Sequence, residues 1–260
     1  MAIPSLRYCL SSVKGGRTVS EWFTDIKEEF ILNFIKDNRW HYLTSGLGNT
    51  LRITAVAVLL GILIGTLVAI IRSTWDKNNE SMHNGAGKAC FRILNSICKI
   101  YLTIIRGTPV VVQLMISYYI IFASSNNGVL VAMLAFGINS GAYVAEIIRS
   151  GIMSIDNGQF EAGRSLGFSF VQTMWFIIVP QALKNVLPAL ANEFIVLLKE
   201  TSVAGYVAVM DLTKGADIIR GRTYSPFMPL LAVAAIYLIL VVFFTWLVGK
   251  LERRLRNSEH

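Results

Sequence analysis

Charged side chains are scarce in this sequence. Aspartate, glutamate, lysine and arginine make up 15% of the 260 residues, whereas they make up about 25% of an ordinary soluble domain. Hydrophobic residues make up 54%, and the mean hydropathy is +0.55. No long stretch alternates apolar with charged residues, as a half-exposed surface requires. A sizeable water-soluble domain is therefore excluded, and we expect most of the chain to lie in lipid.

Histidine and cysteine are also few, with three of each. The cysteines are odd in number and lack the spacing of metal ligands. The histidines are too widely scattered for a metal centre or a catalytic triad. These residues are Cys9, Cys90, Cys98, His41, His83 and His260. We therefore expect neither a metal site nor a catalytic residue in this chain.

A complete phosphate-binding loop is missing too. Residues 84–89 end in Gly-Lys-Ala, but the motif needs an earlier glycine and a hydroxyl residue after the lysine. We expect no nucleotide or other cofactor in this chain. The formal charge of +8 does not indicate nucleic-acid binding, because many of the basic residues flank apolar segments, as they do beside anionic headgroups.

Long uncharged runs predict an all-α membrane protein with about five transmembrane helices. The clearest runs are residues 53–71 and 223–249. A third run, residues 107–145, is too long for one helix and is divided by a polar turn at 124–128. The predicted spans are about 50–71, 97–123, 129–148, 185–209 and 226–249.

Two prolines mark the less regular spans. Pro109 is expected to kink the second span. Between the third and last spans only one segment can cross, because the directions of these two spans require an odd number of crossings between them. We predict that residues 185–209 cross, and that residues 165–184, which contain Pro180, approach along the interface.

Five crossings place the two termini on opposite sides of the membrane. The turn at 124–128 has no lysine or arginine, whereas Arg149 and Arg164 follow the third span. The positive-inside rule then places the N-terminus outside and the C-terminal tail, residues 256–260, in the cytoplasm. Basic residues among the first 49 disagree with this assignment, but charges in a long tail weigh less.

Two polar regions lie outside the predicted spans. Residues 1–45 form a tail ahead of the membrane domain, which comprises residues 46–255. Within this tail, residues 20–36 have apolar side chains at helical spacing, which predicts an amphipathic helix on the membrane surface. Residues 73–89 are polar and contain glycine and asparagine, which predicts a flexible cytoplasmic insertion.

A short polar segment, residues 158–167, follows the third span and reads Gly-Gln-Phe-Glu-Ala-Gly-Arg-Ser-Leu-Gly. Glu161 and Arg164 are three residues apart, as in a short helix, and Gly167 would end that helix. Such a helix at the cytoplasmic surface would serve as a docking site for a partner protein. An ordinary interhelical loop is an equally good interpretation of the spacing alone.

The segment resembles the cytoplasmic coupling loop, or EAA loop, of bacterial ABC importer permeases. Glu161 and Gly167 stand at the two signature positions and Pro180 closes the pattern, whereas Gly163 replaces the usual second alanine. Other stretches resemble the polar amino acid branch, which includes histidine, arginine and glutamine permeases. They are Arg106-Gly107-Thr108-Pro109 with Gln113, residues 139–146, residues 192–195 and residues 199–202, and the resemblance covers about residues 45–255.

This resemblance implies a type I ABC importer permease in the bacterial plasma (inner) membrane. Two permease subunits, identical or sister chains, would surround the translocation path. Two copies of a separate ATP-binding subunit would hold ATP and magnesium, and an extracytoplasmic solute-binding protein would deliver a polar amino acid. The ATPase-coupling residues, in a loop at about 156–170, would be Glu161, Ala162, Gly163, Arg164 and Gly167.

The fourth predicted span contains charged residues. A charge inside a bilayer costs about 2.5–3.5 kcal/mol on insertion scales and usually faces a water-filled cavity or a partner. Glu193 and Glu200 are seven residues apart, close to one stripe of a helix. The predicted substrate path comprises Asn192, Glu193, Lys199, Glu200, Thr201 and Ser202. The alternative is that Lys199 and Glu200 form a structural pair at a helix end.

Other polar residues are expected to have structural roles. Glu146 and Arg149 are predicted to form an ion pair near the cytoplasmic end of the third span. Arg106 and Pro109 are expected to shape the kink rather than bind substrate, and Tyr143 could do either.

The main alternative function is an ion-coupled secondary amino acid transporter, which would also use buried acids. Such carriers commonly contain inverted repeats, and the five unequal predicted spans show none. A membrane scaffold would have little reason to place acids inside a bilayer. The paired acids weakly favour a cationic amino acid such as arginine, lysine or histidine, and leave glutamine, glutamate and cystine open.

Overall fold

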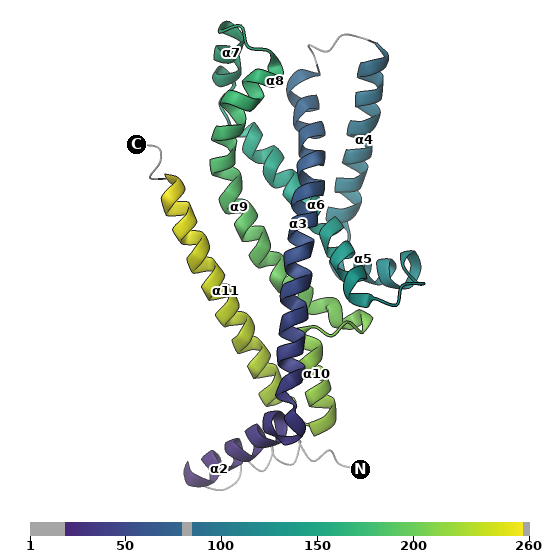
Figure 1. The fold of residues 1–260 in the computed structure, drawn as a ribbon, viewed down its shortest axis with the longest axis vertical. Coiled ribbons are helices and arrows are strands. Elements are labelled where there is room, and N and C mark those ends of the chain that lie inside the picture. The colour runs from purple at the N-terminus through teal and green to yellow at the C-terminus, as the bar shows by residue number, and fades with distance from the viewer. Residues whose placement is uncertain (1–18, 80–84, 257–260) are drawn as a thin grey trace.

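The computed structural model describes residues 19–79 and 85–256, which form helices and connecting turns with no strand among them (Figure 1). This confirms the predicted all-α class. Residues 1–18 of the predicted tail and residues 257–260 lie outside the described part. The elements are α2 (Val19–Phe30), η1 (Ile31–Ile35), η2 (Lys36–Asn38), α3 (Trp40–Asn78), α4 (Ala86–Gly107), α5 (Val110–Ile116), η3 (Ser117–Ile121), α6 (Gly128–Met153), α7 (Asn157–Ser165), α8 (Phe170–Thr173), η4 (Met174–Ile178), α9 (Val179–Glu200), η5 (Thr201–Val207), α10 (Leu212–Thr223) and α11 (Phe227–Arg256).

Four helical runs are long and apolar enough to cross a membrane, and a fifth is added if one bent pair counts as a single span. The four runs are Trp40–Asn78, Gly128–Met153, Phe170–Val207 and Phe227–Arg254. The bent pair consists of α4 followed by α5 and η3. The expectation of about five apolar helices is therefore confirmed.

Helices α3 and α6 pack so closely that side chains of α6 lie directly against the backbone of α3. Small residues recur every four positions along one buried side of α3, at Ala57, Gly61, Gly65 and Ala69. A Cβ atom on Gly61 would lie 2.8 Å from Ser140 Oγ, and one on Gly65 would lie 2.5 Å from Val144 Cγ1. Small side chains at such positions let two membrane helices approach closely, so the α3–α6 pair forms the centre of the bundle.

The second span breaks sharply at Pro109, where the chain bends by 109° between α4 and the segment Val110–Ile121. The kink expected there is thus present. It leaves backbone carbonyl groups without helical partners, and the Gln113 side chain donates hydrogen bonds to two of them. Gln113 Nε2 donates to Ile105 O at 2.7 Å and to Thr108 O at 3.0 Å. Its Oε1 accepts from Asn139 Nδ2 on α6 at 3.0 Å. The amide therefore supplies the hydrogen bonds that lipid could not.

The fourth apolar run is longer than predicted. Phe170–Val207 forms one helical run of 38 residues, which takes in most of residues 165–184, and the place of those residues along the interface stays a prediction. Ser169 begins this run with a capping box that includes Gln172. Pro180 does not interrupt it, because it comes just after the π-helical turn η4, where the backbone hydrogen bonding already departs from the α-helical pattern.

The polar stretch 73–89 is mostly helical rather than a flexible insertion. Helix α3 continues to Asn78 with Ser73 buried, and α4 begins at Ala86, so only residues 80–84 lie outside the described part. Trp75 of α3 stacks on Phe91 of α4 with ring centroids 6.1 Å apart. This contact holds the two helices together where the sequence predicts a loop.

Helix α10 is a short element that the sequence does not predict, and it lies beside the first part of α3 (Figure 1). Buried Asp211 caps it by accepting hydrogen bonds from the backbone of Thr213 and Lys214. Burial raises the pKa of Asp211, and these hydrogen bonds partly oppose that shift. Leu212 N also donates to Thr50 Oγ1 of α3 at 3.1 Å, which fixes α10 against α3.

Helix α2 extends sideways at the end of the molecule opposite α7 (Figure 1). Its junction with α3 is held by Asn33, whose Oδ1 accepts from Thr223 Oγ1 at 2.8 Å. Phe23, Phe30 and Ile35 are exposed on this segment. An amphipathic helix therefore occupies the predicted region, and its place on the membrane surface stays a prediction.

Candidate functional site

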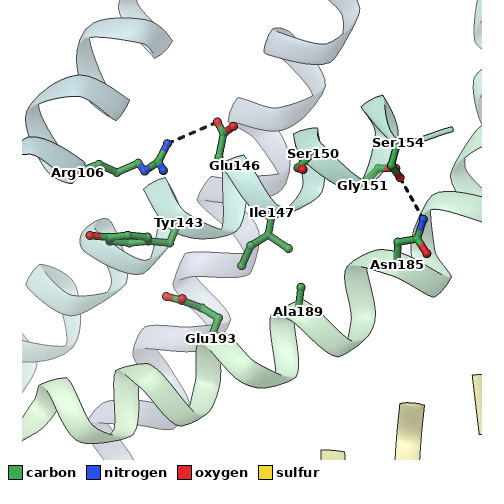
Figure 2. Close-up of a pocket in the computed structure, with 10 residues that line it drawn as sticks. All are labelled: Arg106, Tyr143, Glu146, Ile147, Ser150, Gly151, Ser154, Asn185, Ala189 and Glu193. Carbon is green, nitrogen blue, oxygen red and sulfur yellow. Dashed lines mark hydrogen bonds and ion pairs between the residues drawn. The ribbon is translucent and has the colours of Figure 1, made fainter. Parts of the chain in front are cut away.

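A pocket of about 490 Å³ opens between α4, α6 and α9 (Figure 2). Its apolar walls carry four groups able to bind a charged or polar ligand: Arg106, Tyr143, Glu146 and Glu193. Toward α7 the pocket ends at Ser154 and Asn185, where Asn185 Nδ2 donates to Ser154 Oγ at 3.0 Å. The volume is within the range of small-molecule sites.

Arg106, on one wall of the pocket, supplies a partly exposed positive charge. Arg106 Nη1 lies 3.7 Å from Glu146 Oε2, and the Arg106 side chain is 43% exposed. Glu146 already accepts two hydrogen bonds from Arg149, at 2.6 and 3.2 Å. The predicted Glu146–Arg149 pair is therefore present. Because this bidentate pair satisfies Glu146, the Arg106 guanidinium, 5.8 Å from the Tyr143 ring, keeps capacity for a further anion.

The opposite charge comes from α9. Glu193 lines the pocket, and its Oε1 accepts from Ser140 Oγ at 3.1 Å. Ser140 is itself held against Gly61 by the close packing of α3 on α6. Within the described part of the chain, no three histidine, cysteine, aspartate or glutamate residues are grouped to hold a metal ion. The site therefore offers one free carboxylate and one guanidinium as charged ligands.

The six residues of the predicted substrate path do not share one environment. Only Glu193 lines this pocket. Asn192 and Lys199 are exposed on another side of α9, while Glu200 and Ser202 are partly buried. Thr201 is fully buried and donates to Leu198 O at 2.8 Å. Lys199 and Glu200 are the last two residues of α9 and, among the described residues, are not close enough for a salt bridge, so the alternative of a structural pair stays a prediction.

The predicted coupling segment forms helix α7, at the end of the molecule opposite α2 and α10 (Figure 1). Asp156 caps its start by accepting from Gly158 N at 2.6 Å. Its other end is a Schellman motif, in which Gly167 N donates to Arg164 O and Phe168 N donates to Gly163 O. Gly167 has φ +81°, a conformation that favours glycine.

Helix α7 packs closely on the segment that follows it. Gly163 is buried, and a Cβ atom there would lie 2.7 Å from both Cγ2 and Oγ1 of Thr173. Phe160 packs into a small core around Ile152 and Ile178. Glycine at position 163 therefore permits this close contact between α7 and α8.

The outer side of α7 is available to a partner. Glu161, Ala162 and Arg164 are exposed. Leu166 is 73% exposed, and Val171, beyond Gly167, is 72% exposed. A mixed apolar and charged surface of this kind suits docking of another protein.

Sequence reasoning missed Arg106 and Asn185 as pocket residues and gave Tyr143 no definite role. One feature of the sequence could have indicated that Arg106 lies near Glu146: the two residues stand at the two ends of one long uncharged stretch. The break at Pro109 and the turn between η3 and α6 together reverse the chain, so that these two ends meet in space.

Comparison with known proteins gives a consistent result. A family model described as binding-protein-dependent transport system inner membrane component matches residues 85–257. A putative glutamine transport system permease protein of Rickettsia typhi is 36% identical, over 82% of this chain and 93% of that protein. The arginine transport system permease protein of Bacillus subtilis is 32% identical, over 84% of this chain and 94% of that protein.

The fold is also similar to solved structures. A chain in the crystal structure of an amino acid ABC transporter with histidines matches with a TM-score of 0.73 and 38% identity, covering 85% of this chain and 98% of that chain. A chain of the MetNI methionine ABC transporter in an inward-facing conformation matches with a TM-score of 0.67 and 20% identity, covering 83% of this chain and 97% of that chain.

Proposed function

Because the chain belongs to the family of binding-protein-dependent transport system inner membrane components, we propose that it moves a polar amino acid across the bacterial plasma membrane. As a family member it is a multi-pass inner membrane protein and not an enzyme. The amino acid substrate is supported by relatives named for glutamine and arginine transport. ATP hydrolysis would occur in a separate partner subunit, coupled through α7.

The observation that carries this proposal is the pairing of charges in the pocket. Arg106 and Glu193 line it from different helices (Figure 2). Every free amino acid has a carboxylate and an ammonium group at neutral pH. Arg106 would bind the carboxylate, with Glu146 already satisfied by Arg149, and Glu193 would bind the ammonium. This assigns Arg106 a substrate role in addition to its place at the break.

The remaining residues of the predicted path belong to the same proposal. Asn192 and Lys199 are exposed on α9 and would line the path once a second permease subunit covers that face. Glu200, Thr201 and Ser202 would continue it beyond Glu193. A second copy of this chain or a sister chain would fit this role, and an extracytoplasmic binding protein would deliver the amino acid.

Coupling would occur at α7. Glu161, Ala162 and Arg164 would contact the ATP-binding subunit, and the exposed Glu161 side chain forms no ion pair or hydrogen bond with the rest of the described chain. Gly163 and Gly167 would hold the helix in the required shape, through its close packing and its end. This role requires α7 on the cytoplasmic side, and α2 with the N-terminus outside.

Transport by the complex reconstituted in proteoliposomes tests the substrate site. Competition among labelled glutamine, arginine, histidine and cystine would identify the substrate, and ATP must be required for uptake. Arg106→Gln and Glu193→Gln should each raise the half-saturating concentration at least about tenfold, since hydrogen bonds to charged groups contribute roughly 1.5–3 kcal/mol. Glu200→Gln should lower uptake less. Normal uptake by Arg106→Gln and Glu193→Gln would refute the pocket assignment, and uptake driven by an ion gradient alone would favour a secondary transporter.

A Gly167→Asp substitution tests the coupling assignment. It forces a side chain into a left-handed conformation at the end of α7, although the surrounding space is open. The variant should insert into the membrane but lose transport and co-purify poorly with the ATP-binding subunit. Normal uptake, or labelling of Glu161→Cys only from the extracellular face, would contradict the assignment.

A further inference from the structure

A chain of ion pairs leads from the pocket to the end of α3. Arg106 lies 3.7 Å from Glu146, which is paired with Arg149 at 2.6 Å. Arg149 Nη1 in turn lies 3.3 Å from Asp76 Oδ2. Three helices, α4, α6 and α3, are therefore joined by alternating charges. This chain begins at the group proposed to bind the substrate carboxylate.

The residue after Asp76 contacts the coupling helix directly. Lys77 Nζ donates to Asn157 Oδ1 at 2.6 Å and lies 4.6 Å from the centroid of the Phe160 ring. Both partners belong to α7, one at its first residue and one on its inner face. A lysine ammonium can satisfy both contacts at once, because it is a compact cation with three donors. Asp76 and Lys77 thus touch the pocket network and α7 from adjacent positions of one helix.

The arrangement of charges makes the network sensitive to a ligand. Glu146 and Asp76 compete for Arg149, and Arg106 competes with Arg149 for Glu146. A carboxylate bound to Arg106 withdraws that cation from Glu146, so Glu146 interacts more strongly with Arg149. Arg149 then interacts less strongly with Asp76. Occupancy of the pocket therefore alters the forces at the end of α3, one residue from the contact with α7.

We propose that Lys77 is a positioning residue that makes ATP hydrolysis by the partner subunit respond to the amino acid in the pocket. The inference rests on the proposed function, because it assumes that the pocket holds the amino acid and that α7 docks on the ATPase. Lys77 ties α7 to the α3–α6 pair, and Asp76 ties the same helix end to the pocket. Neither residue lines the pocket.

The test uses the full complex in nanodiscs, with its ATP-binding subunits and solute-binding protein. The ATPase rate is measured without amino acid and with whichever of glutamine, arginine, histidine or cystine the uptake panel identifies. Lys77→Met removes the cation but keeps the side-chain length, and Lys77→Arg restores a cation. Lys36→Met is the matched control, because Lys36 is an exposed lysine beyond the other end of α3.

Lys77→Met should reduce the ratio of stimulated to basal ATPase rate at least about fivefold, the lower end of usual coupling between sites. Lys77→Arg should recover most of this ratio, and Lys36→Met should match the unsubstituted complex. If Lys77→Met also lowers the basal rate, the ratio remains the measured quantity. Asp76→Asn, which breaks the link to Arg149 without touching α7, should lower the ratio as well.

Three results would overturn the inference: an unchanged ratio in Lys77→Met, an equal fall in Lys36→Met, or no recovery in Lys77→Arg. These differ from failure of the proposed function. In that case the unsubstituted complex would show neither uptake nor ATPase stimulation with any amino acid of the panel. Stimulation in the unsubstituted complex that persists in Lys77→Met would leave the proposed function standing and remove the role of Lys77.

Discussion

Replacing Gly163 by alanine should destabilise this protein, although alanine is the usual residue at this position of the coupling loops that the segment resembles. Alanine in place of an interior helical glycine adds about 1 kcal/mol of stability through helix propensity. Here the added methyl would lie 2.7 Å from both Cγ2 and Oγ1 of Thr173 and 3.2 Å from Ile177 Cδ1. Such overpacking costs about 1–3 kcal/mol, so we expect a net loss of up to about 2 kcal/mol.

The sign should reverse when Thr173 is shortened. Thr173→Ala removes both clashing atoms, and the lost hydroxyl is buried without a hydrogen-bond partner among the described residues. Loss of its methyl costs about 0.8 kcal/mol, which removal of the unpaired hydroxyl offsets in part. Gly163→Ala made in the Thr173→Ala background should then stabilise by nearly the full 1 kcal/mol of helix propensity. The two substitutions should therefore be coupled by about 1–3 kcal/mol.

The assay is a double-mutant cycle on the free energy of unfolding, measured by tryptophan fluorescence during titration of the purified protein with a denaturing detergent. Gly167→Ala serves as the control, because position 167 has open space and its cost should not depend on Thr173. If Gly163→Ala stabilises equally in both backgrounds, the close contact between α7 and the segment after it does not exist, and the reasoning fails.

Three further predictions concern the rest of the fold. Gln113→Leu should cost about 1–3 kcal/mol of unfolding free energy, because the carbonyl of Ile105 loses its partner at the break between α4 and α5, and unfolding in mixed micelles measures this. Gly65→Val should cost at least as much, since its Cβ would lie 2.5 Å from Val144 Cγ1, and a fall in the fraction of folded protein after detergent extraction would reveal it. Asp211 binds its proton more tightly when folded, so its contribution to stability is present at low pH and is lost as the pH rises through the raised pKa. Asp211→Asn, which keeps a capping oxygen without a charge, should remove that part of the pH dependence of thermal stability, and an unchanged profile would contradict the burial argument.

Most of the helical framework could be predicted from the sequence, because an apolar run flanked by charges has few alternatives to a membrane-crossing helix. Residues 53–71 lie within α3, and the turn at 124–128 separates η3 from α6. The break at Pro109 and the end of α7 at Gly167 follow from the backbone restrictions of proline and glycine. These features depend on local chemistry that the sequence displays directly.

The features that were missed depend on contacts between distant segments. Helix α10 exists because Asp211 caps it and Thr50 accepts a hydrogen bond from Leu212, and neither contact leaves a pattern in the sequence. The full length of the run Phe170–Val207 was also missed, because its continuity through Pro180 depends on the π-helical turn η4 just before that residue. Arg106 joined the pocket only because the chain reverses direction after it.

The close approach of α3 and α6 limits how this protein can move. With glycines 61 and 65 set directly against the side chains of α6, the two helices cannot slide or tilt past one another without steric overlap. They must travel as one body, carrying Tyr143 and Glu146 along. Any widening or narrowing of the pocket during a transport cycle therefore has to come from α9 and α4, and their own close contacts with α6, at Gly151 and Gly141, would have to shift as well.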